Sequence, residues 1–200
     1  MSAVCNKYLS LSAEDLRDKK QLAQAAGTEL TAASSEVCRA LELAEHGDGL
    51  AAASVYAAAA KDRLGAAARM LAQVADILAT GTLTAETAAW AGRLDYDRLY
   101  RSGLSLGQVP HSAELWQAFT WQARTGGPLG ICHDMRERTL AVAVLIGDWL
   151  ERTDDAAADT ALTRIQSAMA DLAAYAQIVA FANKVEPRDP AWVVPQGTAA

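Results

Sequence analysis

The stretch Thr139–Leu150, TLAVAVLIGDWL, decides the fold of this chain. Wound into a helix, it is apolar on nearly every side, and only Thr139, Gly147 and Asp148 interrupt it. A helix that is apolar all round has to be surrounded by other elements. The run is shorter than the roughly 20 apolar residues that a membrane-spanning helix needs. The sequence therefore predicts a central helix, residues 129–152, inside a soluble helical protein.

The part of the chain before this helix predicts two further long helices. Apolar residues recur there at alternating steps of three and four, which is a heptad-like seam. The first seam is Ala23, Ala26, Leu30, Ala33, Val37, Ala40 and Ala44, and the second is Leu50, Ala53, Ala57, Ala60, Leu64, Ala67, Leu71, Val74 and Leu78. Glycines at 47 and 49 favour a helix end between the two seams, because glycine accepts the left-handed conformation of a helix cap. Because the connection is so short, residues 12–80 should form an antiparallel hairpin. We expect Cys38 to be a buried thiol in the first seam.

The remaining segments complete the predicted architecture. A last stripe, from Ala158 to Val179, pairs with the central helix in a second hairpin, residues 129–184, and a tail follows at 185–200. Residues 82–128 differ, and predict short helices at about 84–99 and 112–123 with loops at 102–110 and 124–130. The predicted fold is all-α. It is an antiparallel up-down bundle of four long helices in one domain, residues 1–200, with a two-short-helix insertion between the second and third.

Composition and motifs narrow the function classes. The net charge of −6 disfavours nucleic-acid binding, because an acidic chain repels phosphate backbones. Three cysteines without metal-ligand spacing, and an N-terminus without signal-peptide features, predict a cytoplasmic protein that does not insert into a membrane. The chain has no Glu-x-x-His pair and no phosphate-binding glycine motif. We therefore expect no metal, no cofactor and no catalytic residues, and favour a non-enzyme.

The start of the central helix holds the densest polar group. Cys132 and His133 are adjacent, so they point about 100° apart on a helix and do not form a dyad. Asp134 and Arg138 are spaced to pair on the surface, whereas Arg136 and Glu137 are expected to face different ways. The glycine-rich residues 126–130 before it suit a turn, or an anion at a helix N-terminus.

Asp148 is the sharpest anomaly in the apolar stretch. A buried carboxylate needs a partner. Arg63 and Arg69, on the second predicted helix, are the candidates. A buried structural ion pair is favoured over a catalytic acid.

The predicted site lies at the bundle end covered by residues 82–128. There the insertion would bring cationic loop residues over the start of the central helix, beside aromatic side chains of the kind that line ligand sites. The candidate ligand-binding residues are Arg101, His111, Arg124, His133, Arg136, Trp90, Tyr100 and Trp121.

Two functional hypotheses follow from this pattern. The first is a non-enzymatic helical bundle that acts through protein contacts, as a homo-oligomer, an adaptor or an inhibitor of a basic partner. The alternative is a protein or enzyme that takes a small anionic ligand beneath the 82–128 insertion. An enclosed pocket near Arg101, Arg124 and His133 would favour the second hypothesis, and a broad exposed apolar patch would favour the first.

Overall fold

The computed structural model describes residues 13–46, 50–80, 95–107, 109, 112–151 and 155–185. All regular structure in these ranges is helical, which confirms the predicted all-α class for them. The helices are α1 (Ala13–Glu45), α2 (Leu50–Thr80), α4 (Tyr96–Leu106), α5 (Ala113–Thr125), α6 (Gly127–Leu150) and α7 (Asp155–Val185).

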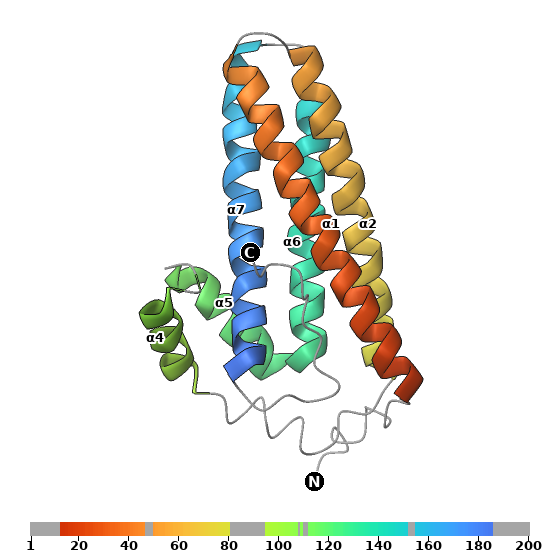
Figure 1. Ribbon diagram of the computed structural model, residues 1–200, viewed down its shortest axis with the longest axis vertical. Coiled ribbons are helices and arrows are strands. Elements are labelled where there is room, and N and C mark those ends of the chain that lie inside the picture. Colours follow the sequence, from red (N-terminus) through yellow and green to blue (C-terminus); the bar gives the residue numbers. More distant parts are fainter. Residues whose placement is uncertain are drawn as a thin grey trace.

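The long helices α1, α2, α6 and α7 lie side by side (Figure 1). Helix α1 packs along α2, α2 along α6, α6 against α7, and α7 against α1. The shorter helices α4 and α5 lie beside the lower half of α7, where α5 contacts both α6 and α7. Helix α4 touches the long helices only lightly, through α7.

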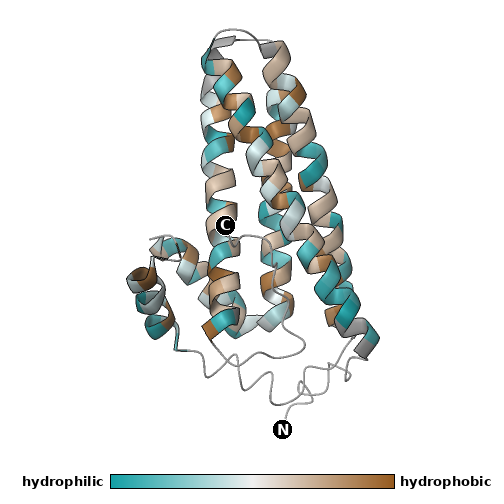
Figure 2. Ribbon diagram, in the orientation of Figure 1, coloured by the Kyte–Doolittle hydropathy of each residue, from teal (hydrophilic) through white to brown (hydrophobic). Residues whose placement is uncertain are grey.

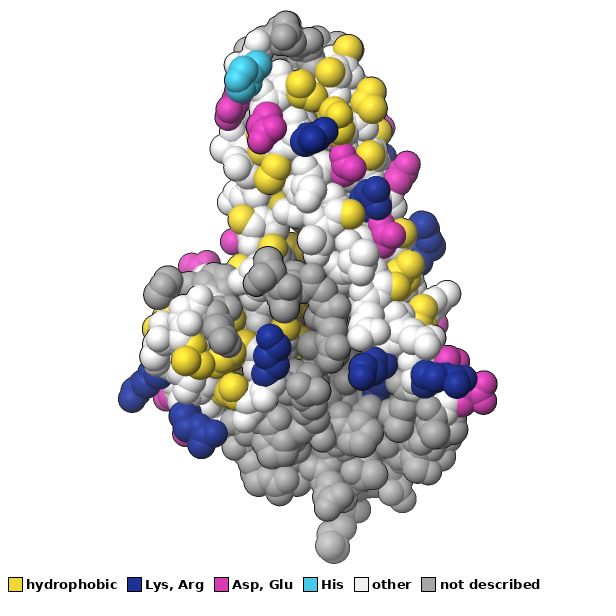
Figure 3. Space-filling view, viewed as in Figure 1, with side chains coloured by type: hydrophobic (Ala, Val, Ile, Leu, Met, Phe, Trp, Pro, Cys, Tyr) yellow, Lys and Arg dark blue, Asp and Glu magenta, His cyan; other side chains and the backbone are white. Residues whose placement is uncertain are grey.

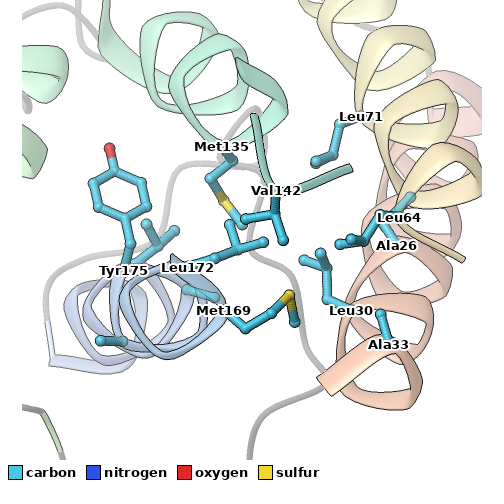
Figure 4. Packing of buried hydrophobic residues seen from close by; sticks show 14 of the residues in the cluster. Ala26, Leu30, Ala33, Leu64, Leu71, Met135, Val142, Met169, Leu172 and Tyr175 are labelled. Carbon is cyan, nitrogen blue, oxygen red and sulfur yellow. The ribbon is translucent and has the colours of Figure 1, made fainter. Parts of the chain in front are cut away.

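The predicted seams form the core. Every position of the first stripe from Ala23 to Ala40, and of the second from Ala53 to Leu78, is buried. Figure 4 shows Leu30 and Leu64 pointing toward Val142, Met169 and Leu172 from across the core. Alanine on both seams lets α1 and α2 approach closely, while larger side chains fill the space toward α6 and α7. Apolar and polar residues alternate along the long helices in Figure 2, as expected when one face of each is packed.

Helix ends follow local chemistry. Nδ1 of His46 lies 2.6 Å from the carbonyl oxygen of Glu42, so its imidazole caps the last turn of α1. The Ser112 hydroxyl accepts a hydrogen bond from the Leu115 amide at the start of α5. At the start of α4, Asp95 accepts one from the Arg98 amide.

Both loops expected in the 82–128 segment are shorter than predicted. Helix α4 continues through Leu106 and ends at Gly107, whose φ of 62° suits a left-handed cap. Only Gly126 separates α5 from α6, because Gly127 turns the chain with φ 57° and Pro128 fits the first helical turn. Arg101 and Arg124 therefore lie on helices and not in loops. Residues 84–94, where the first short helix was expected to begin, lie outside the described residues.

The central helix is not buried all round, contrary to the prediction. Val142, Ile146 and Trp149 are buried, but Val144 is 60% exposed and Asp148 is also exposed. Helices α2, α5 and α7 contact α6, and its outward face stays open to solvent.

The expected ion pair of Asp148 is wrong for the same reason. Its carboxylate lies at the surface and needs no buried partner. Arg63 instead pairs with α1, with its guanidinium 3.2 Å from Glu29 and 3.9 Å from Glu36. Arg63, which the sequence suggested as a partner for Asp148, therefore joins α2 to α1 instead.

Cys38 is exposed, whereas the sequence predicted a buried thiol. The buried stripe of α1 passes through Val37, and the next residue along a helix is rotated by about 100°. That rotation carries Cys38 out of the core.

One described stretch, Thr160–Ala182 of α7, is long and apolar enough to cross a membrane by length and composition. This is weak support for a span, since half of its most apolar window is buried by other helices, as in many core helices.

Candidate functional site

A groove between α4 and α5 is the candidate site. It encloses about 630 Å³ and is open to solvent. Its lining is Asp95, Tyr96, Asp97, Tyr100, Ala113, Trp116, Gln117, Thr120, Trp121 and Arg124. The volume lies within the range of small-molecule and side-chain pockets.

Aromatic side chains build the floor of the groove. Trp116 is buried and meets the rings of Tyr100, Phe119 and Phe181 edge-on, with centroids 5.6, 6.0 and 6.3 Å away. Tyr96 meets Phe119 in the same way at 6.0 Å. Such edge-to-face pairs each contribute about 0.5–1.5 kcal/mol beyond their buried area. Because Phe181 belongs to α7, this cluster also fixes the groove to the long helices.

The local sequence explains why these rings converge. Tyr96, Leu99, Tyr100 and Gly103 recur at steps of three and four on α4, so they share its inner face. Trp116, Phe119 and Ala123 do the same on α5. Trp121 falls between these positions, so it points outward and is 67% exposed at the groove edge.

The groove carries two carboxylates and one guanidinium. Arg124 lies over the ring of Tyr96, with its central carbon 4.8 Å from the ring centroid. Burial raises the pKa of the Tyr96 hydroxyl to about 12, and the Arg124 charge opposes that rise. Asp95 caps α4, whereas Asp97 is exposed and forms no ion pair within the described part of the chain. The groove is therefore slightly acidic and rich in aromatic faces.

The structure brings together only some of the predicted site residues. Tyr100, Trp121 and Arg124 line the groove. Arg101 is exposed on α4 and His133 on α6, and neither lines it; Arg136 does not line it either. Trp90 and His111 lie outside the described residues.

The sequence did not predict the other seven lining residues: Asp95, Tyr96, Asp97, Ala113, Trp116, Gln117 and Thr120. The first three belong to a segment rich in aromatic and charged residues, 90–101, and that enrichment was the available signal. The sequence did not show that α4 starts at Tyr96. That starting point determines which residues lie on the inner face of α4.

The polar start of α6 serves packing. Arg138 pairs with Asp134 at 3.1 Å, as predicted, and its guanidinium lies 4.6 Å from the ring centroid of Tyr175 on α7. Burial and the nearby Asp134 carboxylate raise the pKa of the Tyr175 hydroxyl, which forms no well-aligned hydrogen bond with the described residues. This cluster ties α6 to α7.

Arg136 and Glu137 were expected to face different ways, but they do not. Their side chains pair at 2.8 Å, because two long side chains on adjacent helical residues can bend toward each other over the exposed surface. Such exposed pairs contribute little to stability.

Other chemistry in this region is sparse. The Cys132 thiol is buried and donates a hydrogen bond to the Leu71 carbonyl at 3.2 Å. Burial raises its pKa to about 12, so it remains a protonated thiol near neutral pH. Across the described residues, no group of three or more His, Cys, Asp or Glu side chains is arranged to hold a metal ion.

Comparison of the chain with known protein families, with characterised proteins and with solved structures gives no match.

Proposed function

We propose that this chain is a non-enzymatic cytoplasmic protein that binds a protein partner through the α4–α5 groove. The proposal includes its architecture: α1, α2, α6 and α7 form an up-down bundle, and α4 with α5 is an insertion carrying the binding surface. The observation that carries it is the groove itself. The groove has a volume of about 630 Å³, an aromatic floor and an exposed tryptophan at its edge.

Trp121 is the strongest single support for a partner. Trp121 is 67% exposed at the edge of the groove, and tryptophan is enriched among the residues that dominate binding energy at protein interfaces. Figure 3 shows hydrophobic side chains gathered over the α4–α5 region, with Lys and Arg side chains at its edges. The long helices need no such surface to pack.

The charges in the groove favour a partner segment that presents one cationic side chain. Asp97, which forms no ion pair with another described residue, lines the same groove as Tyr100 and Trp121. Aromatic faces attract Lys and Arg side chains, and a neighbouring carboxylate strengthens that preference. A dense basic run is less suitable, because the groove lining has two carboxylates and the Arg124 guanidinium, which would repel further cations.

A peptide titration tests this proposal. The probe is acetyl-Ala-Ala-Arg-Ala-Ala-amide, and the same peptide with citrulline in place of arginine is the uncharged control. We expect the arginine peptide to shift the indole NMR signals of Trp121 and Trp116, and the citrulline peptide to bind more weakly. Removing one carboxylate–cation interaction in Asp97→Asn should weaken binding about two- to five-fold.

Asp148→Asn is the matched control, because it removes an equally exposed carboxylate near the opposite end of α6. It should leave binding unchanged. Failure of the arginine peptide to bind the wild-type protein and its groove variants would overturn the proposal.

The alternative is a small anionic ligand held by Arg124. Inorganic phosphate is the probe for it. Phosphate shifting the same indole signals, with loss of the effect in Arg124→Gln, would replace our proposal with this alternative. The two carboxylates of the groove oppose it.

A further inference from the structure

Arg124 already occupies the kind of position that a partner's cation would take. Its guanidinium lies 4.8 Å from the centroid of the Tyr96 ring, and both residues line the groove. Arg124 reaches this position from the last turn of α5, while Tyr96 is in the first turn of α4. The contact therefore joins the two walls of the groove at one end.

Among the described residues, Arg124 makes its charge interaction with the Tyr96 ring and forms no ion pair. No carboxylate there lies within 4.0 Å of its guanidinium, although Asp95 and Asp97 line the same groove. Its side chain is exposed at the surface. An arginine held over a ring without an ion pair is weakly held, because cation–π contacts at exposed sites are modest.

We infer that Arg124 is an internal occupant of the binding groove, which a partner's arginine side chain must displace from the Tyr96 ring. The inference rests on the proposed function and adds regulation to it: the stacked Arg124 lowers the affinity for a cationic segment. Two guanidinium groups cannot cover one ring face together, and the Arg124 charge also repels an incoming cation. Displacement exposes the Tyr96 face to the partner and moves the Arg124 side chain toward solvent.

The test compares charge-neutral variants at two positions. Arg124→Gln removes the occupant, and Arg101→Gln removes an equally exposed cation from α4 that does not line the groove. With the arginine peptide above, Arg124→Gln should bind about two- to five-fold more tightly than wild type, the worth of one exposed cation–π contact. Arg101→Gln should match wild type within two-fold. Arg124→Lys, which keeps the charge but loses the planar group, should fall between wild type and Arg124→Gln.

Each outcome decides the question. Unchanged or weaker peptide binding in Arg124→Gln, with wild-type binding that depends on Asp97, overturns the inference and leaves the proposed function standing. An equal gain in Arg124→Gln and Arg101→Gln attributes the effect to long-range charge and also overturns it. Absence of peptide binding in wild type, Arg124→Gln and Arg124→Lys alike rejects the proposed function and the inference with it. Circular dichroism and the ring-proton signals of Tyr96 and Phe119 report whether the variants keep the fold.

Discussion

At the scale of single residues, one turn of α6 separates core from surface. Ile146 is fully buried, while Leu145 is only partly buried against the core and Val144 is largely exposed. All three are branched apolar residues of similar character. Their position around the helix, and not their hydrophobicity, sets what each contributes to stability.

Truncations at these neighbouring positions should therefore differ. Ile146→Ala should lower the free energy of unfolding by about 2–5 kcal/mol, as for other fully buried large residues. Leu145→Ala should cost less, because part of its side chain already meets water. Val144→Ala should change stability by no more than about 0.5 kcal/mol. Urea unfolding monitored by circular dichroism gives all three values, and equal losses at 145 and 146 would contradict the orientation of α6.

The buried thiol of Cys132 predicts an alkaline loss of stability. Burial raises its pKa from about 9 in the unfolded chain to about 12, so above pH 9 the unfolded state releases this proton more readily than the folded state. Its contribution is complete below pH 9 and is lost as the pH rises toward 12, with a slope of up to about 1.4 kcal/mol per pH unit. Melting temperatures between pH 8 and 10 should fall less steeply in Cys132→Ala than in wild type. Cys38→Ala, which removes an exposed thiol, is the control and should keep the wild-type slope.

At the scale of elements, the position of α4 beside α7 depends on Gly103. A Cβ atom on Gly103 would collide with Cγ2 of Val109 and lie 3.4 Å from Cε1 of Phe181 on α7. At this point the backbone of α4 therefore packs directly against the Val109 side chain and close to the Phe181 ring of α7.

Gly103→Ala should push α4 away from the Val109 side chain and disturb its packing beside Phe181 of α7. We expect a loss of about 1–3 kcal/mol in the free energy of unfolding, typical of overpacking, together with weaker binding of the arginine peptide. Gly65→Ala is the matched control on α2. Its Cβ would meet only the Arg69 guanidinium, at an ordinary contact distance of 3.5 Å. It should stabilise the protein by about 0.5–1 kcal/mol, since alanine favours a helix interior. A stabilised Gly103→Ala protein would contradict the packing described for α4.

At the scale of the whole molecule, packing is uneven. Helix α2 contacts both α1 and α6 extensively, whereas α4 has only light contact with α7. Helix α5 is intermediate, with contacts to α6 and α7. Segments with few buried contacts open at lower free energy than the core. The proposed binding surface thus lies on the part of the protein that opens most easily.

Hydrogen exchange should show this gradient. Backbone amides within α4 should exchange through local opening, at rates well above those of the α2 interior, which we expect to open only on global unfolding. Low concentrations of denaturant should accelerate exchange in α2 strongly and in α4 little, since global opening exposes more surface. Equal protection of α4 and α2 would show that the helices unfold as one unit.

The sequence by itself determined that the described chain is all-α and which faces of α1 and α2 form the core. Their seams at steps of three and four, with glycines at 47 and 49, are local patterns, and helix periodicity turns them directly into buried faces. The caps at His46 and Ser112 are local as well, because each involves neighbours in the chain.

Tertiary structure alone decided which side of α6 meets solvent and where the groove lies. The nearly uniform apolar character of residues 139–150 carried no periodicity to mark an outer face, so Asp148 could not be placed. The groove needs Tyr96 of α4 to meet Phe119 of α5, and Tyr100 of α4 to meet Trp116 of α5, with Phe181 of α7 against Trp116. Those contacts join residues far apart in the chain, and a local pattern does not encode the distance at which separate helices pack.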